Sequence, residues 1–435
     1  MILALSLLLV AGLCRSPTAA SSEDPSYDHQ TKTYTSTHKP VSCTNKVTAT
    51  PFFSPDHSIE VYVDLINAAS TSIDLYAPGF SSWSGCTQYD TSCVGCSLSD
   101  ARAEAFPVFP ALLNAKHARN VTIRILTNDY GTPTCANEIA PLDWLYLNGI
   151  EIKYFTTVTF MHSKVIVVDR GTKTSISSVN FSKTSFLYNR EAGVIIDAGC
   201  DAVADFVLEV FDADWAQATD YAPTNKYTSS QMSYITNSAT LPVDIPPPRH
   251  IDNAYVTGLK SVESVSVIDL YTSPDFALAE LNQSLGTART SFQLMIYQVT
   301  DDSLCDGLMR LNGSGVDVTL LVSRRIFSED DWKAAQVCYE KLHKYGLKIQ
   351  LTPSYYDYSH QKIWIIDSKE VHLSTGNWSP TDYPDASSFP PYTSHGWVEA
   401  NRNFVIAMAD NDIVKIFSSL FEEDFSRGEE WTPHY

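Results

Sequence analysis

A chain of 435 residues that is 44% apolar and 11% aromatic is too long for one ordinary core and too apolar for a disordered protein, so we expect two domains or a duplicated one. It carries 50 acidic against 30 basic residues, a net charge of −20, without a run of lysine or arginine. This balance argues against a protein that binds duplex DNA, because such proteins offer the phosphates a basic surface.

The first residues predict a secretory signal peptide. Met1–Val10 is an apolar run too short to cross a bilayer, and small residues up to Ala20 follow it. We therefore expect residues 1–20 to be the signal, cleaved after Ala20, and the protein to be secreted or lysosomal. The positively charged start of most signals is missing, and the alternative is a retained membrane anchor. No other segment is apolar and long enough to cross a membrane.

A secretory route also suits the cysteines. Without Cys14 of the signal, eight of the nine cysteines remain, and an even number in a secreted chain suggests disulfide bonds. Cys93-Val-Gly-Cys96 has the spacing of half a zinc site, but no second pair accompanies it, so we favour a disulfide. The expected glycosylation sites are the sequons at Asn120, Asn282 and Asn312.

Residues 46–220 are predicted to form a first α/β unit. Ser54-Pro55-Asp56 opens an amphipathic run, as a helix start does, and a second helical pattern covers about 202–218. Between them lie short β-branched and apolar runs that predict strands, at 73–76, 121–126, 151–154, 165–168 and 193–196. Strands that alternate with helices indicate an α/β sandwich.

Reactive residue types surround the strand expected at 165–168. His162-Ser-Lys164 precedes this strand and Asp169 follows it. Asn180 then lies in a Ser-rich turn, and Glu191 comes after the turn. A single His-x-Lys occurs often by chance, so this cluster alone predicts no function.

A Thr-, Ser- and Pro-rich stretch at 221–253 is the predicted linker, and 254–430 is the predicted second unit. The second unit repeats the first: Ser273-Pro-Asp opens its first helical stretch, the strand and helix patterns recur in the same order, and a helix is expected over 411–426. The openings lie 219 residues apart but the histidines only 198, so the first unit holds 21 extra residues, which we place in the Cys-rich stretch Trp83–Ala105.

The reactive residues are repeated as well. His360-Gln-Lys362 precedes a strand, Asp367 follows it at the same spacing as in the first copy, and Asn377 lies in the next turn. Chance does not readily repeat a histidine, a lysine, an aspartate and an asparagine at matching positions. Two copies supply the paired groups that a phosphodiester site needs without a metal.

The pattern His-x-Lys-x4-Asp with a downstream turn asparagine, twice in one chain, resembles the phospholipase D superfamily of phosphodiesterases. The resemblance covers nearly all of the chain after the signal. It implies two similar α/β sandwich halves related by a pseudo-two-fold axis, with one shared active site. There are two departures: Ser177 stands where the family's turn usually begins with glycine, and Asn403 stands where the first half has Glu191.

The residue types themselves explain the chemistry. Lys164, Lys362, Asn180 and Asn377 can donate hydrogen bonds to the phosphate oxygens on which charge develops. A neutral imidazole can attack phosphorus, while a second, protonated imidazole donates to the leaving oxygen. No cluster of metal ligands accompanies the motifs, so we expect neither a metal nor a cofactor.

The roles of the pairs follow from their surroundings. We expect His162 to be the nucleophile, because Glu191 could hydrogen-bond its far nitrogen, and His360 to be the acid and later the base. Asp169 and Asp367 come at strand ends, so we expect both to be structural.

The substrate is less well defined by the sequence. The acidic chain favours a phospholipid or membrane surface, with the aromatic residues of Pro380–Glu399 as an apolar rim, although the same segment could be a packed loop. The resemblance also implies an alternative, because some secreted and lysosomal members of the superfamily are exonucleases: a 5′ exonuclease on single-stranded nucleic acid, which needs only aromatic stacking and a local basic pocket. A third possibility is an inactive binding protein. The sequence leaves the oligomeric state open.

Overall fold

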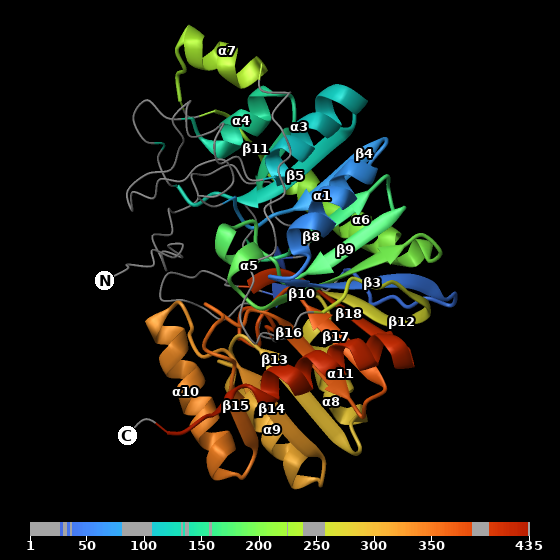
Figure 1. Ribbon diagram of the computed structural model, residues 1–435, viewed down its shortest axis with the longest axis vertical. Helices are drawn as coiled ribbons and strands as arrows, with labels where there is room; N and C mark the ends of the chain where they lie inside the picture. The colour runs from blue at the N-terminus through green and yellow to red at the C-terminus, as the bar shows by residue number, and fades with distance from the viewer. Residues whose placement is uncertain are drawn as a thin grey trace.

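The computed structural model describes residues 27–28, 33–34, 37–80, 107–131, 134, 139–155, 159–223, 225–237, 257–384 and 400–433. The predicted signal peptide, the Cys-rich stretch and most of the aromatic rim therefore lie outside the described residues. Figure 1 shows two halves, the first coloured blue to green and the second yellow to red. Two short strands near the start, β1 (Tyr27–Asp28) and β2 (Thr33–Tyr34), pair with each other.

The first half is built on an eight-stranded sheet. Its strands are β3 (Val47–Ser54), β4 (Ser72–Tyr76), β5 (Thr122–Asn128), β6 (Glu151–Phe155), β8 (Val165–Val168), β9 (Lys173–Ser177), β10 (Glu191–Asp197) and β11 (Thr219–Asp220). They are paired in the order β11-β6-β5-β4-β8-β9-β10-β3, with β4, β5 and β6 parallel and the other pairings antiparallel. Apolar strands such as β8, buried along their whole length, occupy the centre.

The second half repeats this sheet strand for strand. Its strands are β12 (Val262–Ser273), β13 (Ser291–Ile296), β14 (Asp317–Val322), β15 (Lys348–Leu351), β16 (Lys362–Ile366), β17 (Glu370–Ser374), β18 (Ala400–Ala409) and β19 (Glu429–Glu430). The order is β19-β15-β14-β13-β16-β17-β18-β12, again with one parallel triplet. The predicted fold class, two similar α/β halves, is confirmed.

Helices cover both faces of each sheet. One face carries α1 (Ser58–Ala68), α3 (Val108–Arg119) and α4 (Pro141–Leu147) in the first half, and α8 (Ala277–Thr287), α9 (Asp302–Gly313) and α10 (Glu329–Lys344) in the second. The other face carries α6 (Asp201–Gln217) and α11 (Asn411–Ser426), close to the ranges expected from the sequence. The short helix α5 (Lys183–Leu187) follows β9.

The predicted linker at 221–253 is not wholly irregular. Helix α7 (Ser229–Asn237) forms within it and packs against α4, with Ile235 fully buried. Tyr221 is also buried, and its hydroxyl donates a hydrogen bond to Asp143 of α4. The start of the linker is therefore part of the first half.

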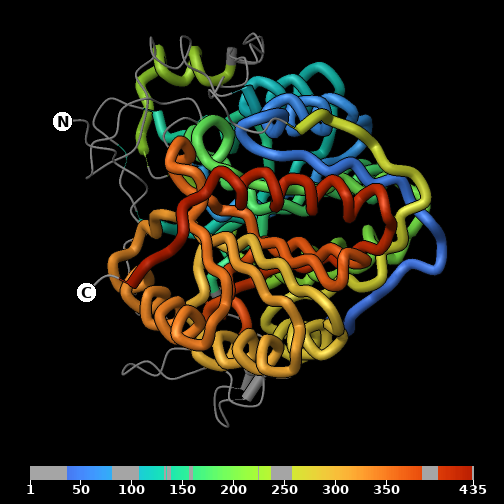
Figure 2. Tube along the Cα trace, turned by 60° about the horizontal axis from the view of Figure 1, so that its bottom comes forward, coloured from blue at the N-terminus to red at the C-terminus, as the bar shows by residue number. Residues whose placement is uncertain are grey.

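The two halves share one core. Apolar side chains of α6 and α11 and of both sheets form a continuous cluster, in which the rings of Phe53 and Phe417 lie 5.4 Å apart. Figure 2 shows α11, in red, crossing the middle of the molecule between the two halves. Edge strands β3 and β12 pair across the boundary, and β7 (Thr159–Met161) pairs in parallel with β18.

Two buried ion pairs cross the boundary in opposite directions. Arg190 donates to Asp424 of α11 from Nε at 2.8 Å and from Nη2 at 3.2 Å. Arg402 donates to Asp214 of α6 at 3.1 Å from each of the same two atoms. Each guanidinium also reaches an aspartate near the start of its own half, Asp56 and Asp275 respectively. The pseudo-two-fold axis thus relates charges as well as strands.

A segment at 37–46, which we call the strap, runs over both halves. Its Cys43 is bonded to Cys200 at the start of α6, and its Val41 makes a β-bridge to Leu270 of β12. The backbone N–H groups of Thr37 and His38 donate to Asp275 at 2.8 and 3.1 Å. A second disulfide, between Cys305 and Cys338, joins α9 to α10.

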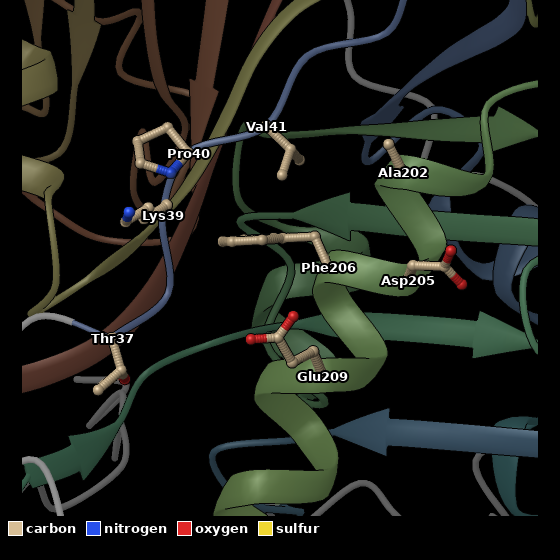
Figure 3. A pocket seen from close by; sticks show the side chains of 8 residues that line it. All are labelled: Thr37, Lys39, Pro40, Val41, Ala202, Asp205, Phe206 and Glu209. Atoms are coloured by element: carbon tan, nitrogen blue, oxygen red, sulfur yellow. The ribbon is translucent and has the colours of Figure 1, made fainter.

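A cavity of about 390 Å³ lies between the strap and α6 (Figure 3). Phe206 and Glu209 of α6 face Pro40 and Lys39 of the strap across it. None of the repeated reactive residues lines this cavity. Within the described ranges, no helix has both the length and the apolar character that a bilayer crossing requires.

Candidate active site

The two histidine motifs lie at equivalent edges of the two sheets. His162-Ser-Lys164 connects β7 to β8, and His360-Gln-Lys362 leads into β16. Because β8 runs antiparallel to β4, Val165 at its start lies beside Tyr76 at the carboxyl end of β4. Lys362 lies beside Ile296 of β13 in the same way. Both motifs therefore sit where the central parallel strands end.

Backbone hydrogen bonds bring the two motifs together across the boundary. The N–H of His162 donates to the carbonyl of Arg402 at 3.0 Å, and the N–H of His360 donates to the carbonyl of Arg190 at 2.8 Å. His162 is thus fastened to β18 of the opposite half, and His360 to the residue directly before β10. The ε-amino group of Lys164 also donates to the carbonyl of Thr375 in the second half, at 3.3 Å. The repeated residues form one site.

Each imidazole is oriented by a buried carboxylate. Nδ1 of His360 lies 2.8 Å from Glu191, and Nδ1 of His162 lies 3.2 Å from Asp382. Both carboxylates are buried, and ionised carboxylates only accept hydrogen bonds, so Nδ1 must carry the proton in each ring. This leaves Nε2 as the free lone pair, and no described residue is hydrogen-bonded to either Nε2.

The prediction that Glu191 contacts His162 is wrong. Glu191 follows Arg190, whose carbonyl binds the backbone of His360, and this register places the carboxylate beside the histidine of the other half. The residue beside His162 is Asp382, which the sequence reasoning missed. Asn403, which replaces the carboxylate in the second half, donates to Asp382 at 2.8 Å. The one signal of Asp382 in the sequence was Asn403 at the position equivalent to Glu191. Because Asn403 has no carboxylate, a carboxylate beside His162 had to come from another segment.

The two carboxylates differ in the number of hydrogen bonds that they accept. Asp382 accepts further hydrogen bonds from the side chains of Asn401 and Ser379 and from the backbone N–H of Asn377. Besides His360, Glu191 accepts from the side chains of Ser178 and Asn189. The pKa of Asp382 is held below its usual range by its neighbours, His162 first. Burial raises the pKa of Glu191, but His360, Lys362 and Ser178 together lower it below its usual value.

The two lysines concentrate positive charge in the site. Both are fully buried, and their ε-amino groups donate to the carbonyls of their own histidines, Lys164 at 2.5 Å and Lys362 at 2.6 Å. Burial lowers the pKa of Lys362 to about 7. Burial and the charge of Lys362 place the pKa of Lys164 well below its usual value. A bound anion would relieve both effects, so the site is suited to a phosphate.

Both histidines are poor proton acceptors in the free protein. Burial, followed by the charge of Lys164, lowers the pKa of His162 to about 4. Burial also lowers the pKa of His360 to about 4, although Glu191 opposes this effect. At neutral pH both imidazoles are therefore neutral, which is the form that can act as a nucleophile.

The two turn asparagines lie just after equivalent strands of the two sheets. Asn180 and Asn377 follow β9 and β17 and are half-buried rather than fully buried. Oδ1 of Asn377 is enclosed and has no hydrogen-bond partner among the described residues. A Cβ at Gly376 would lie 2.5 Å from the Asn403 side chain, so this turn needs glycine.

Asp169 and Asp367 lie away from this chemistry. They come at the opposite ends of β8 and β16 from the histidines. Asp169 accepts hydrogen bonds from the backbone N–H groups of Ser70, Thr71 and Ser72. Asp367 does the same for 289–291. These contacts hold the turns that lead into β4 and β13.

The predicted glycosylation sites are accessible to different degrees. Asn120 at the end of α3 and Asn282 in α8 are exposed, and Asn312 in α9 is partly exposed. Among the described residues, no group of three or more His, Cys, Asp or Glu side chains could hold a metal ion.

Comparison with known proteins points to one family. The family model described as "Cardiolipin synthase, PLD-like domain" matches residues 62–215 and 281–425, most of both halves. No curated protein sequence matches the chain.

Similar folds occur among solved structures. The phosphatidylserine synthase of Haemophilus influenzae Rd KW20 is 11% identical with a TM-score of 0.56, over 89% of this chain and 90% of that one. The phospholipase D family member Nuc of Salmonella typhimurium is 18% identical with a TM-score of 0.32, over 38% of this chain and 98% of that one. The first likeness supports the fold, and the second adds nothing to it.

Proposed function

We propose that this chain, which belongs to the phospholipase D superfamily as the family match over both halves shows, is a phosphodiesterase. Its reaction passes through a phosphohistidine. One observation carries the proposal. Two imidazoles, each held at Nδ1 by a buried carboxylate, present free Nε2 atoms in a site that also contains two buried lysines. This set supplies a nucleophile, an acid and anion-stabilising donors.

The reaction proceeds in two displacements at phosphorus. In the first, Nε2 of one histidine forms a bond to phosphorus as the bond to the leaving oxygen breaks, and the other histidine gives its proton to that oxygen. In the second displacement, the histidine that gave up its proton takes a proton from water. The water oxygen then bonds to phosphorus as the bond to the other imidazole breaks. Lys164 and Lys362 stabilise the charge on the non-bridging oxygens in both steps.

The environment of each histidine assigns the roles. His360 lies closer to its carboxylate, and Glu191 has fewer competing donors than Asp382. His360 is therefore the better holder of a proton and acts first as the acid. His162, whose carboxylate is shared with Asn401 and Asn403, is the neutral nucleophile. The assignment made from the sequence is kept, but for a different reason.

Two substrate classes fit a site of this kind. The likeness to cardiolipin synthase domains supports a phospholipid, which would place the enzyme at a membrane surface. Single-stranded nucleic acid is favoured by an exposed aromatic and an exposed basic side chain on the loops beside the two histidines, Tyr130 and Arg325. A secretory or lysosomal location is supported by the disulfides Cys43–Cys200 and Cys305–Cys338, because disulfides persist in oxidising compartments.

A direct assay tests the activity. Purified protein is incubated with phosphatidylcholine vesicles, with a soluble short-chain phosphatidylcholine and with a single-stranded oligonucleotide, each with and without a chelator. We expect hydrolysis of at least one diester that survives the chelator and is lost in His162→Asn. Hydrolysis that persists in His162→Asn would refute the proposal.

The pH dependence should be acidic. The nucleophile must be neutral and the acid protonated, and both histidines have a pKa of about 4. As the pH rises above this value the acid loses its proton, so kcat/KM should fall about tenfold per pH unit. Above pH 7 Lys362 also loses its charge. A profile of kcat/KM with a soluble diester checks this, and an alkaline optimum would contradict it.

A further inference from the structure

Two loops display side chains at equivalent places beside the two histidines. At the end of β5, where the first loop begins, the Asn128 side chain donates to the carbonyl of Met161 at 2.7 Å and accepts from its N–H at 3.0 Å. Met161 directly precedes His162. After β14, the Ser323 hydroxyl accepts from the N–H of Ser359 at 3.0 Å, and Ser359 directly precedes His360. Each loop is therefore fixed to its own catalytic motif.

The first loop presents an aromatic ring. Tyr130, two residues beyond Asn128, is 40% exposed. Its ring centroid lies 6.2 Å from that of Phe160, which in turn lies 6.1 Å from the His162 ring. A Cβ at Gly79 would come 2.7 Å from a ring carbon of Tyr130, so the ring rests on bare backbone. The Tyr130 ring is thus supported on one side and exposed on the other, and Phe160 lies between it and the His162 ring.

The second loop presents a cation instead. Arg325, two residues beyond Ser323, is exposed, and its carbonyl accepts from the Ser323 hydroxyl at 2.7 Å. The N–H of Phe327 in the same loop donates to Tyr297 at 2.6 Å, and the Tyr297 ring lies 4.9 Å from that of His360. The backbone that carries the guanidinium is therefore held close to the acid.

We propose that Tyr130 and Arg325 form two subsites on opposite sides of the scissile phosphate, and that the substrate is a single-stranded polynucleotide. Tyr130 stacks on the base next to His162, and Arg325 binds the next phosphate on the leaving side, near His360. A phosphatidylcholine has neither a flat ring nor a second phosphate for these groups. Stacking and one local cation also suit an acidic chain that lacks a broad basic surface. This inference rests on the proposed function.

Binding can be tested separately from turnover. A fluorescent single-stranded oligothymidylate is titrated into His162→Asn, and its phosphorothioate form into the unmutated protein. We expect Tyr130→Ala to weaken binding roughly 5- to 100-fold and Tyr130→Phe to preserve it. Arg325→Ala should weaken binding and make the plot of log Kd against log salt shallower by about 0.7. The matched controls, Tyr345→Ala and Lys369→Ala, replace exposed side chains of the same kinds and should change neither quantity.

The outcomes separate this inference from the proposed function. Unchanged oligonucleotide binding in both variants would overturn the subsites, as would a protein that binds no oligonucleotide but hydrolyses phosphatidylcholine vesicles. In either case the phosphodiesterase proposal would still be judged by the loss of hydrolysis in His162→Asn. Equal weakening in Tyr130→Ala and Tyr130→Phe would also overturn the stacking role, since phenylalanine keeps the ring.

Discussion

His162→Asn is expected to lower phosphodiester hydrolysis by about 10⁴-fold or more and to abolish the covalent adduct, because the variant has no nucleophilic nitrogen at that position. His360→Asn should be equally slow with a natural leaving group. With a nitrophenyl ester, whose leaving group needs no proton, it should still form the adduct and accumulate it, since no base activates the water.

The measurement is mass spectrometry of the intact protein after an alkaline quench, which preserves phosphohistidine. His117→Asn is a matched control, because His117 is exposed on α3 and its ring is hydrogen-bonded to Asn148, outside the site. An adduct that accumulates in His162→Asn, and not in His360→Asn, would reverse the roles.

Arg402→Ala should reduce the free energy of unfolding by about 3 to 5 kcal/mol, because it leaves the buried carboxylates Asp214 and Asp275 without their guanidinium. Arg402→Lys keeps the charge but cannot reproduce the two-pronged contact with Asp214, so we expect an intermediate loss. Urea unfolding followed by tryptophan fluorescence measures both.

A surface pair provides the comparison. Lys333 and Glu329 form an exposed ion pair one turn apart on α10, so Lys333→Ala should lower the free energy of unfolding far less than Arg402→Ala does. If Arg402→Ala were no more destabilising than Lys333→Ala, the crossing pairs would not hold the halves together.

The repeat made most of the fold predictable. Strand patterns such as 165–168 and 363–366 and helix 411–426 appear in the structure almost where the apolar periodicity placed them. Helix α7 was missed because its sequence is mostly polar and, of its described side chains, Ile235 alone is buried. Local periodicity carries no signal for a helix of that kind.

The pairing of carboxylates with histidines was not predictable. Asp382 and His162 are 220 positions apart, as are many pairs that do not touch. Their contact depends on how the halves interlock, through β7 against β18 and Arg190 against the backbone of His360. The sequence identified the reactive residues because they are repeated, whereas Asp382 has no repeated counterpart.

The exchange of partners between the halves also has a consequence for how the protein is made. Domains generally fold as they leave the ribosome, N-terminal part first. A newly made first half would have His162 without Asp382 and Asp214 without the guanidinium of Arg402. We therefore expect the nascent chain to be inactive until the second half has docked on the first.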